Sequence, residues 1–200
     1  MGSEMCIRDR FKDALTGIYL KLGTTTLYAG DLTYAYLDEL AGLYSDYPGY
    51  NTNAVFDQSI VFDYENMFLS KKNGIYSTMY NIIANINNFL EYVDKNKDVL
   101  VTERYYETMK GEALGLRAFL HFDLLRMFGP VYKEHPASKA IPYRIAFDKD
   151  ATPVLPASEV VDAILKDLND AEKLLKESDP LDFFTCLLYT SPSPRDPKTS

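Results

Sequence analysis

The sequence has 200 residues, of which 46% are hydrophobic, and this is enough for one buried core or for part of a larger one. Its formal net charge is −8, so a role in binding nucleic acid through phosphate neutralisation is disfavoured. The longest apolar runs are broken by charges well before the ~20 residues that a membrane-spanning helix needs. These totals favour a folded protein with no nucleic-acid partner and no membrane span.

The two ends of the chain differ in character from the middle. Residues 1–10, MGSEMCIRDR, and residues 186–200, CLLYTSPSPRDPKTS, resemble translated adapter read-through, and they hold both cysteines, Cys6 and Cys186. We therefore set both ends aside as artefacts and expect residues 11–185 to form the domain. That middle part contains no cysteine, which excludes a disulfide framework and a zinc–thiolate site within it.

The first half of this domain contains three segments with a helical pattern. We predict helices at residues 11–22, at residues 31–44 with Asp31 as the N-cap, and at residues 75–93. The third segment has a regular apolar period but also four asparagines, which are unusual inside a helix. We expect these side chains to form hydrogen bonds between helices rather than to contact a ligand. They are Asn81, Asn85, Asn87 and Asn88.

The second half begins with a long, strongly apolar helix, predicted to run from an N-cap at Thr102 to Gly129. A short connector makes this helix the antiparallel neighbour of the one before it. Residues 134–156 are rich in proline and lack periodicity, so we expect an extended crossing segment without strands. A last helix is predicted from an N-cap at Ser158 to Lys176. Its predicted apolar face consists of Val161, Ile164, Leu165, Leu168, Ala171 and Leu175.

Together these elements predict an all-α fold. The pairing of successive helices indicates a tetratricopeptide-like helical-repeat scaffold, built of antiparallel helix pairs with long connecting loops. No exact internal repeat is present, and the usual Trp-Leu-Gly-Tyr signature of that repeat is absent.

The long helix carries glycines and charges among its apolar residues. Gly111 and Gly115 lie about one turn apart, and each costs about 1 kcal/mol relative to alanine. We therefore expect a neighbouring helix to approach closely at both positions. Arg117 has its apolar stem among packed neighbours, so we expect it to pair with a carboxylate from another helix, because Glu112 is poorly placed on the same helix.

The residues show no arrangement typical of catalysis or of metal binding. His121 lies on a packed helix without a second histidine or a cysteine, which favours a structural role, and His135 is expected at the surface. Asp148 and Asp150 fall short of the about six to eight oxygen ligands that calcium needs. Phosphate-binding, dinucleotide-binding and Gly-x-Ser-x-Gly motifs are absent. The sequence therefore predicts neither an enzyme, nor a cofactor, nor a metal site.

Two loop segments, residues 44–53 and 62–68, are candidates for ligand binding. Tyrosine rings can cover the apolar faces of sugars, and asparagine amides can pair with hydroxyl groups. The alternative is a tyrosine-rich turn that packs on its own scaffold. The candidate residues are Tyr44, Tyr47, Tyr50, Asn51, Asn53, Tyr64 and Asn66.

Residues 111–129, GEALGLRAFLHFDLLRMFG, resemble the signature helix of the SusD/RagB family, the surface nutrient-binding lipoproteins of Bacteroidota. Residues 80–94 resemble the preceding helix of that family, and residues 141–175 its proline-rich crossing with the following helix. The resemblance covers nearly all of residues 11–180 and corresponds to the N-terminal half of a full member. The positions that we assign to the structural signature are Asn85, Gly111, Glu112, Gly115, Arg117, Asp123, Arg126 and Gly129.

The resemblance implies a non-enzymatic protein at the outer surface of the outer membrane. Such a protein forms a lid on a SusC-like, TonB-dependent transporter and captures oligosaccharides, or peptides in RagB-like members, for import. The family is held to the membrane by a lipid anchor, whose cysteine this chain does not carry. The alternative is a helical-repeat scaffold that grips a protein partner and has no small-molecule ligand.

Overall fold

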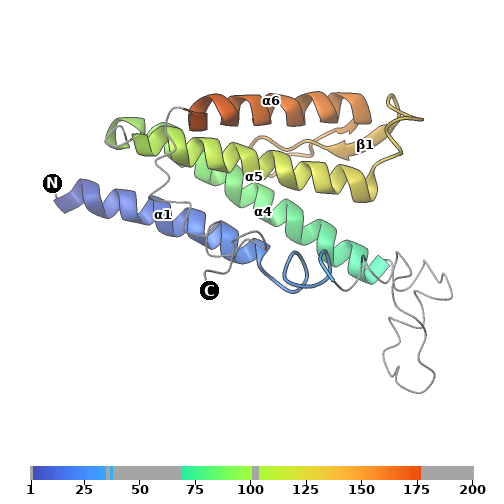
Figure 1. Cartoon of the computed structure of the whole chain (residues 1–200), viewed down its shortest axis with the longest axis horizontal. Coiled ribbons are helices and arrows are strands. Elements are labelled where there is room, and N and C mark those ends of the chain that lie inside the picture. Colours follow the sequence, from blue (N-terminus) through green and yellow to red (C-terminus); the bar gives the residue numbers. More distant parts are fainter. Residues whose placement is uncertain (1, 35–36, 38–68, 101–103, 177–200) are drawn as a thin grey trace, which may run out of the picture.

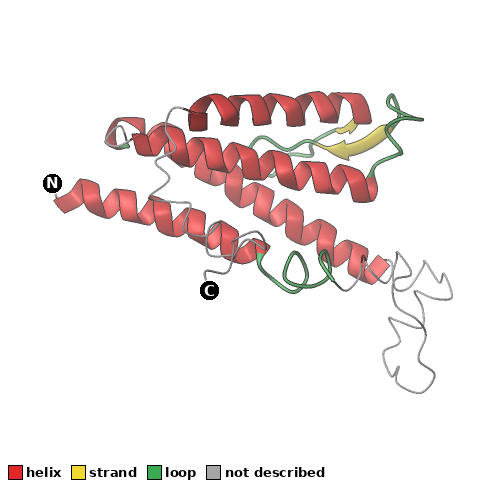
Figure 2. Ribbon diagram, viewed as in Figure 1, coloured by secondary structure: helices red, strands yellow, loops and turns green. Residues whose placement is uncertain are grey.

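The computed structural model describes residues 2–34, 37, 69–100 and 104–176. Within them, helices dominate and two short strands form a hairpin (Figure 2), so the predicted all-α scaffold of antiparallel helix pairs is confirmed. The elements are α1 (Gly2–Leu22), α4 (Leu69–Lys95), the 3-10 turn η2 (Lys97–Val99), α5 (Tyr105–Phe128), β1 (Lys139–Pro142), β2 (Val154–Pro156) and α6 (Ala157–Lys176).

Helix α5 occupies the centre of this arrangement and packs against α4, α6 and α1 (Figure 1). It runs antiparallel to α4, as the short connector predicted. A helix with neighbours on three sides must be apolar around most of its circumference, which explains the composition of this segment. Its buried residues are Tyr105, Thr108, Met109, Gly111, Ala113, Leu114, Arg117, Ala118, Leu120, His121, Leu124 and Leu125.

Helix α1 packs along α4 through an apolar face. Leu15 and Ile18 are buried on this face, and Phe11 meets Phe89 of α4 edge to face with ring centroids 5.9 Å apart. The helix extends back to Gly2, through the ten residues that the sequence analysis set aside. Aromatic and aliphatic packing between α1 and α4 therefore forms one side of the core.

Two predicted helix starts are wrong. Residues 31–34 form turns, so no helix begins at Asp31; of the rest of that predicted helix only Leu37 is among the described residues. Helix α5 begins at Tyr105 behind Arg104, whose φ of 59° places it in the left-handed region, and not behind Thr102. Arg104 leads the chain directly into the helix without a side-chain cap hydrogen bond. The start of α5 therefore carries no capping residue that could be recognised in the sequence. The predicted end of α5 at Gly129 is confirmed.

The crossing segment contains a hairpin that the sequence analysis did not predict. Strands β1 and β2 pair antiparallel, with Lys139 opposite Pro156 and Pro142 opposite Val154, and they pack on α5 and α6. Each strand has only three or four residues and ends in proline, so neither could show the alternation that marks a strand. Helix α6 follows β2 without a loop, which moves its start to Ala157.

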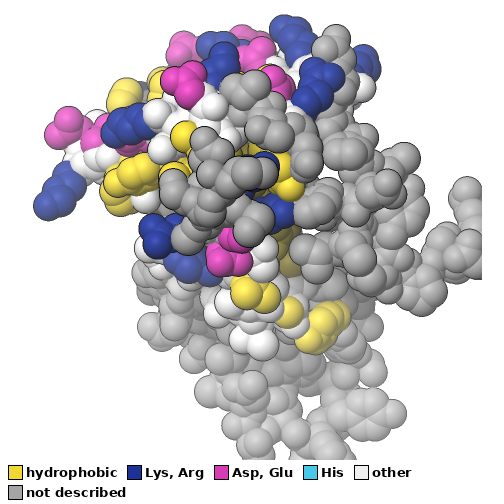
Figure 3. All heavy atoms as spheres, turned by 90° about the vertical axis from the view of Figure 1, so that its left-hand side faces the viewer, with side chains coloured by type: hydrophobic (Ala, Val, Ile, Leu, Met, Phe, Trp, Pro, Cys, Tyr) yellow, Lys and Arg dark blue, Asp and Glu magenta, His cyan; other side chains and the backbone are white. Residues whose placement is uncertain are grey.

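Helix α6 is rotated relative to its predicted apolar face. It buries Ile164, Ala171 and the charged Asp167, whereas Leu165 and Leu168 are 50% and 43% exposed. The buried carboxylate of Asp167 pairs with α5 and fixes this rotation. Ion pairs cover the outer surface of the helix, including Glu172–Lys176 at 2.8 Å, and charges of both signs gather at this end of the molecule (Figure 3).

The two glycines of α5 have different environments. A Cβ atom at Gly111 would lie 2.7 Å from Cγ of Leu175 and 3.3 Å from the carbonyl oxygen of Ala171, so the expected close approach of a helix is present there. A Cβ atom at Gly115 would meet nothing within 4 Å, so the same expectation for Gly115 is wrong. The two residues differ because only Gly111 faces α6.

Candidate functional site

The seven residues that the sequence singled out for ligand binding lie outside the described residues. They stay predictions. They are Tyr44, Tyr47, Tyr50, Asn51, Asn53, Tyr64 and Asn66.

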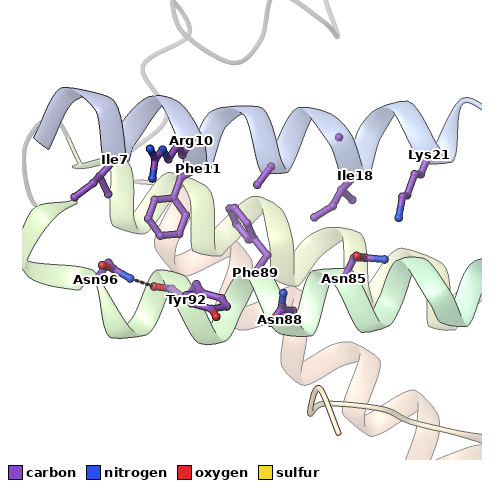
Figure 4. A pocket seen from close by; sticks show the side chains of 12 residues that line it. Ile7, Arg10, Phe11, Ile18, Lys21, Asn85, Asn88, Phe89, Tyr92 and Asn96 are labelled. Atoms are coloured by element: carbon purple, nitrogen blue, oxygen red, sulfur yellow. Dashed lines mark hydrogen bonds between the residues drawn. The ribbon is translucent and has the colours of Figure 1, made fainter. Parts of the chain in front are cut away.

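The described structure instead contains a groove between α1 and α4, with a volume of about 660 Å³. This volume lies within the range of about 300–1,000 Å³ that is typical of ligand pockets. Figure 4 shows side chains of the two helices facing each other across it. The groove is lined by Ile7, Arg10, Phe11, Ala14, Gly17, Ile18 and Lys21 from α1, by Asn85, Asn88, Phe89 and Tyr92 from α4, and by Asn96.

The floor of this groove is apolar, and part of its α1 edge carries only small side chains. Phe11, Phe89 and Ile18 are all buried and form the floor. Ala14 and Gly17 lie on the α1 edge, and a Cβ atom at Gly17 would meet nothing within 4 Å. A bound molecule can therefore reach the apolar floor from this edge without displacing a large side chain.

The α4 edge is polar. Asn85 donates to the carbonyl oxygen of Asn81 at 2.6 Å, and Asn96 donates to that of Tyr92 at 2.8 Å. The Asn88 side chain lies partly buried on the same edge and has no hydrogen-bond partner among the residues that the structure describes. An unpaired, partly buried amide is free to bind polar groups of a ligand.

This polar edge follows a pattern that the sequence analysis interpreted differently. Asn85, Asn88 and Tyr92 recur at helical spacing on one face of α4, and Asn96 continues this spacing directly after the helix. The sequence predicts that these asparagines bond between helices; this is confirmed for Asn87, which accepts a bond from Arg117 of α5, but it is wrong for Asn85, whose hydrogen bonds go to Asn81 of its own helix. The helical spacing alone could have separated Asn87 from the groove-facing residues, but it could not show that α1 lies opposite.

A buried polar network holds α4, α5, α6 and the crossing segment together. Arg117 donates to both carboxylate oxygens of Asp167, from Nε at 2.7 Å and from Nη2 at 2.8 Å. Its Nη1 donates to Oδ1 of Asn87 at 3.0 Å, and the hydroxyl of Tyr143 donates to Asp167 at 2.6 Å. The predicted pairing of Arg117 with a carboxylate of another helix is therefore confirmed. Burial raises the pKa of Tyr143, and its hydrogen bond to Asp167 adds to this effect.

His121 belongs to the same buried region and has a structural environment. The Arg144 backbone N–H donates to its Nε2 at 3.1 Å, so the proton lies on Nδ1, which is 2.8 Å from the carbonyl oxygen of Arg117. Its ring stacks on that of Tyr143 with centroids 4.0 Å apart. Burial lowers the pKa of His121 to about 4. Both nitrogen atoms are therefore occupied by the fold, which supports the structural interpretation.

The chain that follows β1 is held by side chains of α4. The hydroxyl of Tyr80 donates to the carbonyl oxygen of Pro142 at 2.8 Å. The amide of Asn87 donates to the carbonyl oxygens of Arg144 at 3.1 Å and of Ala146 at 3.3 Å. These bonds satisfy backbone carbonyl groups of the crossing segment, so they hold this segment against the helices.

The remaining signature carboxylates connect α5 to α1 and to the turns after it. The hydroxyl of Tyr19 donates to Glu112 at 3.0 Å, and that of Tyr28 donates to Asp123 at 2.7 Å. Asp123 also accepts a bond from Arg126, three residues further along α5, at 3.0 Å. Burial raises the pKa of Tyr19 and of Tyr28, which keeps both hydroxyls protonated as donors.

The described part of the chain offers neither a cluster of metal ligands nor a membrane-spanning helix. Residues 2–34, 37, 69–100 and 104–176 contain no group of three or more His, Cys, Asp or Glu side chains that could hold a metal ion. Among the helices of those same ranges, none is long and apolar enough to cross a membrane. Asp148, one of the two carboxylates that the sequence analysis considered for calcium, accepts a hydrogen bond from Nη2 of Arg144 at 3.0 Å.

Comparison with known proteins identifies the family. The profile of the SusD-like family, described as starch-binding and associating with the outer membrane, matches residues 21–185. The chain therefore belongs to the SusD-like family, whose members are binding proteins rather than enzymes. A comparison with curated proteins found no match.

A solved structure supports the same fold. The described helices resemble the crystal structure, at 1.49 Å resolution, of a SusD superfamily protein from Bacteroides thetaiotaomicron, with a TM-score of 0.65 and 18% sequence identity. The similarity covers 84% of this chain and 37% of that protein, so this chain spans well under half of that relative.

Proposed function

We propose that this chain is part of a cell-surface protein that binds an oligosaccharide or peptide nutrient and delivers it to a SusC-like, TonB-dependent transporter in the outer membrane. The observation that carries the proposal is the family match over residues 21–185, with its description as starch-binding and outer-membrane-associated. A lipid anchor would hold the whole protein at the cell surface. The function is binding and transfer, without a chemical step.

The geometry of the groove between α1 and α4 supports a binding role. Its apolar floor can cover the C–H faces of a sugar, and the amide of Asn88 can pair with hydroxyl groups. Tyr92 on the α4 edge of the groove is 52% exposed. The buried network around Arg117 and Asp167 lies on the other side of α4 from the groove and keeps this helix in place.

A second candidate function is a helical-repeat scaffold for a protein partner. The observation that favours it is the exposure of large apolar side chains on α5 and α6: Phe119 and Phe122 of α5 are 43% and 46% exposed, and Leu165 and Leu168 of α6 are similarly exposed. Exposed apolar residues on adjacent helices are typical of a protein interface. A scaffold of this kind would bind no saccharide.

Saccharide binding by the purified protein tests the proposal. We expect retarded migration in native gels that contain soluble starch or another polysaccharide. Replacing Asn88 and Tyr92 together by alanine tests the groove, and replacing Tyr44, Tyr47 and Tyr50 tests the loop predicted from sequence. Loss of retardation in one variant assigns the site. The control is Tyr132→Ala, because this exposed tyrosine lies outside the groove.

Delivery to a transporter needs a separate experiment. The whole gene product, expressed in its native host, should co-purify from detergent-solubilised outer membranes with a TonB-dependent transporter. Recovery in the cytoplasmic fraction without a transporter, together with no saccharide or peptide binding, would leave the scaffold function as the better explanation.

A further inference from the structure

We infer that the groove between α1 and α4 binds an acidic oligosaccharide, with the acidic group of the sugar beside Lys21. This inference rests on the proposed function and specifies its ligand, which the family description does not. Three features of the groove carry it: the charge of its lining, the unpaired amide on its α4 edge, and the exposed aromatic ring beside that amide.

The lining of the groove is positive although the chain as a whole is negative. Arg10 and Lys21 are the charged residues of the lining, and the lining contains no carboxylate, whereas the whole chain has a formal net charge of −8. Arg10 falls within the ten N-terminal residues that the sequence analysis set aside, so the argument rests on Lys21. The Lys21 ammonium has no ion-pair partner among the described residues. A cation without a protein carboxylate nearby attracts an anionic ligand.

The positions of the polar residues along the groove define the orientation in which the ligand would bind. In Figure 4, Lys21 lies at the Asn85 end of the groove, and Asn96 lies at the opposite end beyond Tyr92. The residues from Asn85 to Asn96 span about 16 Å along α4 at a rise of about 1.5 Å per residue. This length accommodates more than one sugar ring, with the acidic group at Lys21 and a neighbouring ring against Tyr92.

The unpaired amide of Asn88 favours a saccharide over a fatty acid as the ligand. An apolar floor with one cation at its end would also suit a fatty acid, but an alkyl chain has no group to pair with the amide of Asn88. A sugar presents an apolar C–H face to Phe89 and Tyr92 and hydroxyl groups to the amide of Asn88. An acidic oligosaccharide therefore satisfies the floor, the amide and the cation together.

Calorimetry with charged and neutral probes tests the inference. The probes are tetragalacturonate, a hyaluronan tetrasaccharide, a chondroitin sulfate tetrasaccharide and neutral maltotetraose. We expect at least one acidic probe to bind about tenfold more tightly than maltotetraose, because a hydrogen bond to a charged group exceeds a neutral one by about that factor. The preference should decrease in 0.5 M sodium chloride through screening.

Substitutions in the groove test which residues cause the preference for acidic over neutral probes. Lys21→Gln should remove most of the difference between acidic and neutral probes, and Asn88→Ala should weaken the binding of both kinds. Lys166→Gln is the matched control, since it removes a charge from α6, outside the groove, and should leave both affinities unchanged. Circular dichroism melting of each variant verifies that the fold is retained.

The outcomes separate this inference from the proposed function. Maltotetraose binding as tightly as every acidic probe, or an unchanged preference in Lys21→Gln, overturns the acidic specificity but leaves nutrient binding in place. Binding of oleate or of an acidic peptide in preference to all saccharides also overturns it. If no saccharide or peptide binds at all, the proposed nutrient-binding function fails with it.

Discussion

Arg117 and Asp167 face each other across the interface of α5 and α6 and form two parallel hydrogen bonds, at 2.7 and 2.8 Å. Both side chains are 9% exposed, so the pair is shielded from water. Fifty residues of chain separate these partners, and the crossing segment with its hairpin lies between them. This ion pair therefore determines which side of α6 faces the core.

Replacing Arg117 by alanine should strongly destabilise the protein. The variant leaves the Asp167 carboxylate buried without its cation, which costs on the order of 3–5 kcal/mol for a fully buried pair. Urea denaturation followed by circular dichroism measures the change. Lys176→Ala is the control, because it removes a solvent-exposed ion pair within α6, and its denaturation midpoint should not move. Equal effects of the two variants would contradict the role of the buried pair.

The two glycines of α5 should respond to alanine in opposite directions. Gly111→Ala should destabilise the protein by about 1–3 kcal/mol, because the new methyl group would overlap Leu175 of α6. Gly115→Ala should stabilise it by about 0.5–1 kcal/mol, because the methyl group meets open space and restricts the unfolded chain. Thermal melting measures both. Combining Gly111→Ala with Leu175→Ala should restore part of the loss, and additive losses would argue against the proposed overlap.

His121 should make stability depend on pH between about 4 and 6.5. Burial lowers its pKa to about 4 in the folded protein, whereas the unfolded chain titrates near 6.5. Between these values the unfolded state binds a proton that the folded state does not, so stability falls as the pH falls. The decrease should reach about 3 kcal/mol at pH 4 and then level off for this group.

Urea denaturation as a function of pH, in the natural sequence and in two variants, isolates this effect. His121→Gln retains an acceptor for the Arg144 N–H and removes the titration, so its stability should vary less over this range. His135→Gln removes an exposed histidine and should follow the natural sequence. If all three profiles are parallel, His121 is not the group responsible.

Asn87 should contribute more to stability than the other asparagines of α4. It accepts a bond from Arg117 and donates to two carbonyl oxygens of the crossing segment. Asn87→Ala leaves these groups unpaired in a buried place, which costs about 1–3 kcal/mol. Asn81→Ala is the matched control on the exposed side of the same helix. Equal midpoints in chemical denaturation would contradict the contribution of Asn87.

The sequence by itself determined the local structure. The apolar period of residues 75–93 and the long apolar run after it predicted α4 and α5, because the spacing of side chains along a helix is set by its own geometry. Gly129 predicted the end of α5 for the same local reason. The sequence also required a buried partner for Arg117, since a charge among packed residues must be paired.

Only the tertiary structure decided which residues meet. Asp167 could not be recognised as the partner of Arg117, because a charged residue in an amphipathic helix is expected on the exposed face. Since Asp167 is buried instead, Leu165 and Leu168, which were predicted to be buried, are exposed. Gly111 and Gly115 look alike in sequence, yet only one has a helix beside it. The groove that we propose as a binding site exists because α1 lies along α4, far away in the chain. Contacts of this kind depend on how helices rotate and pack, and no local pattern records that.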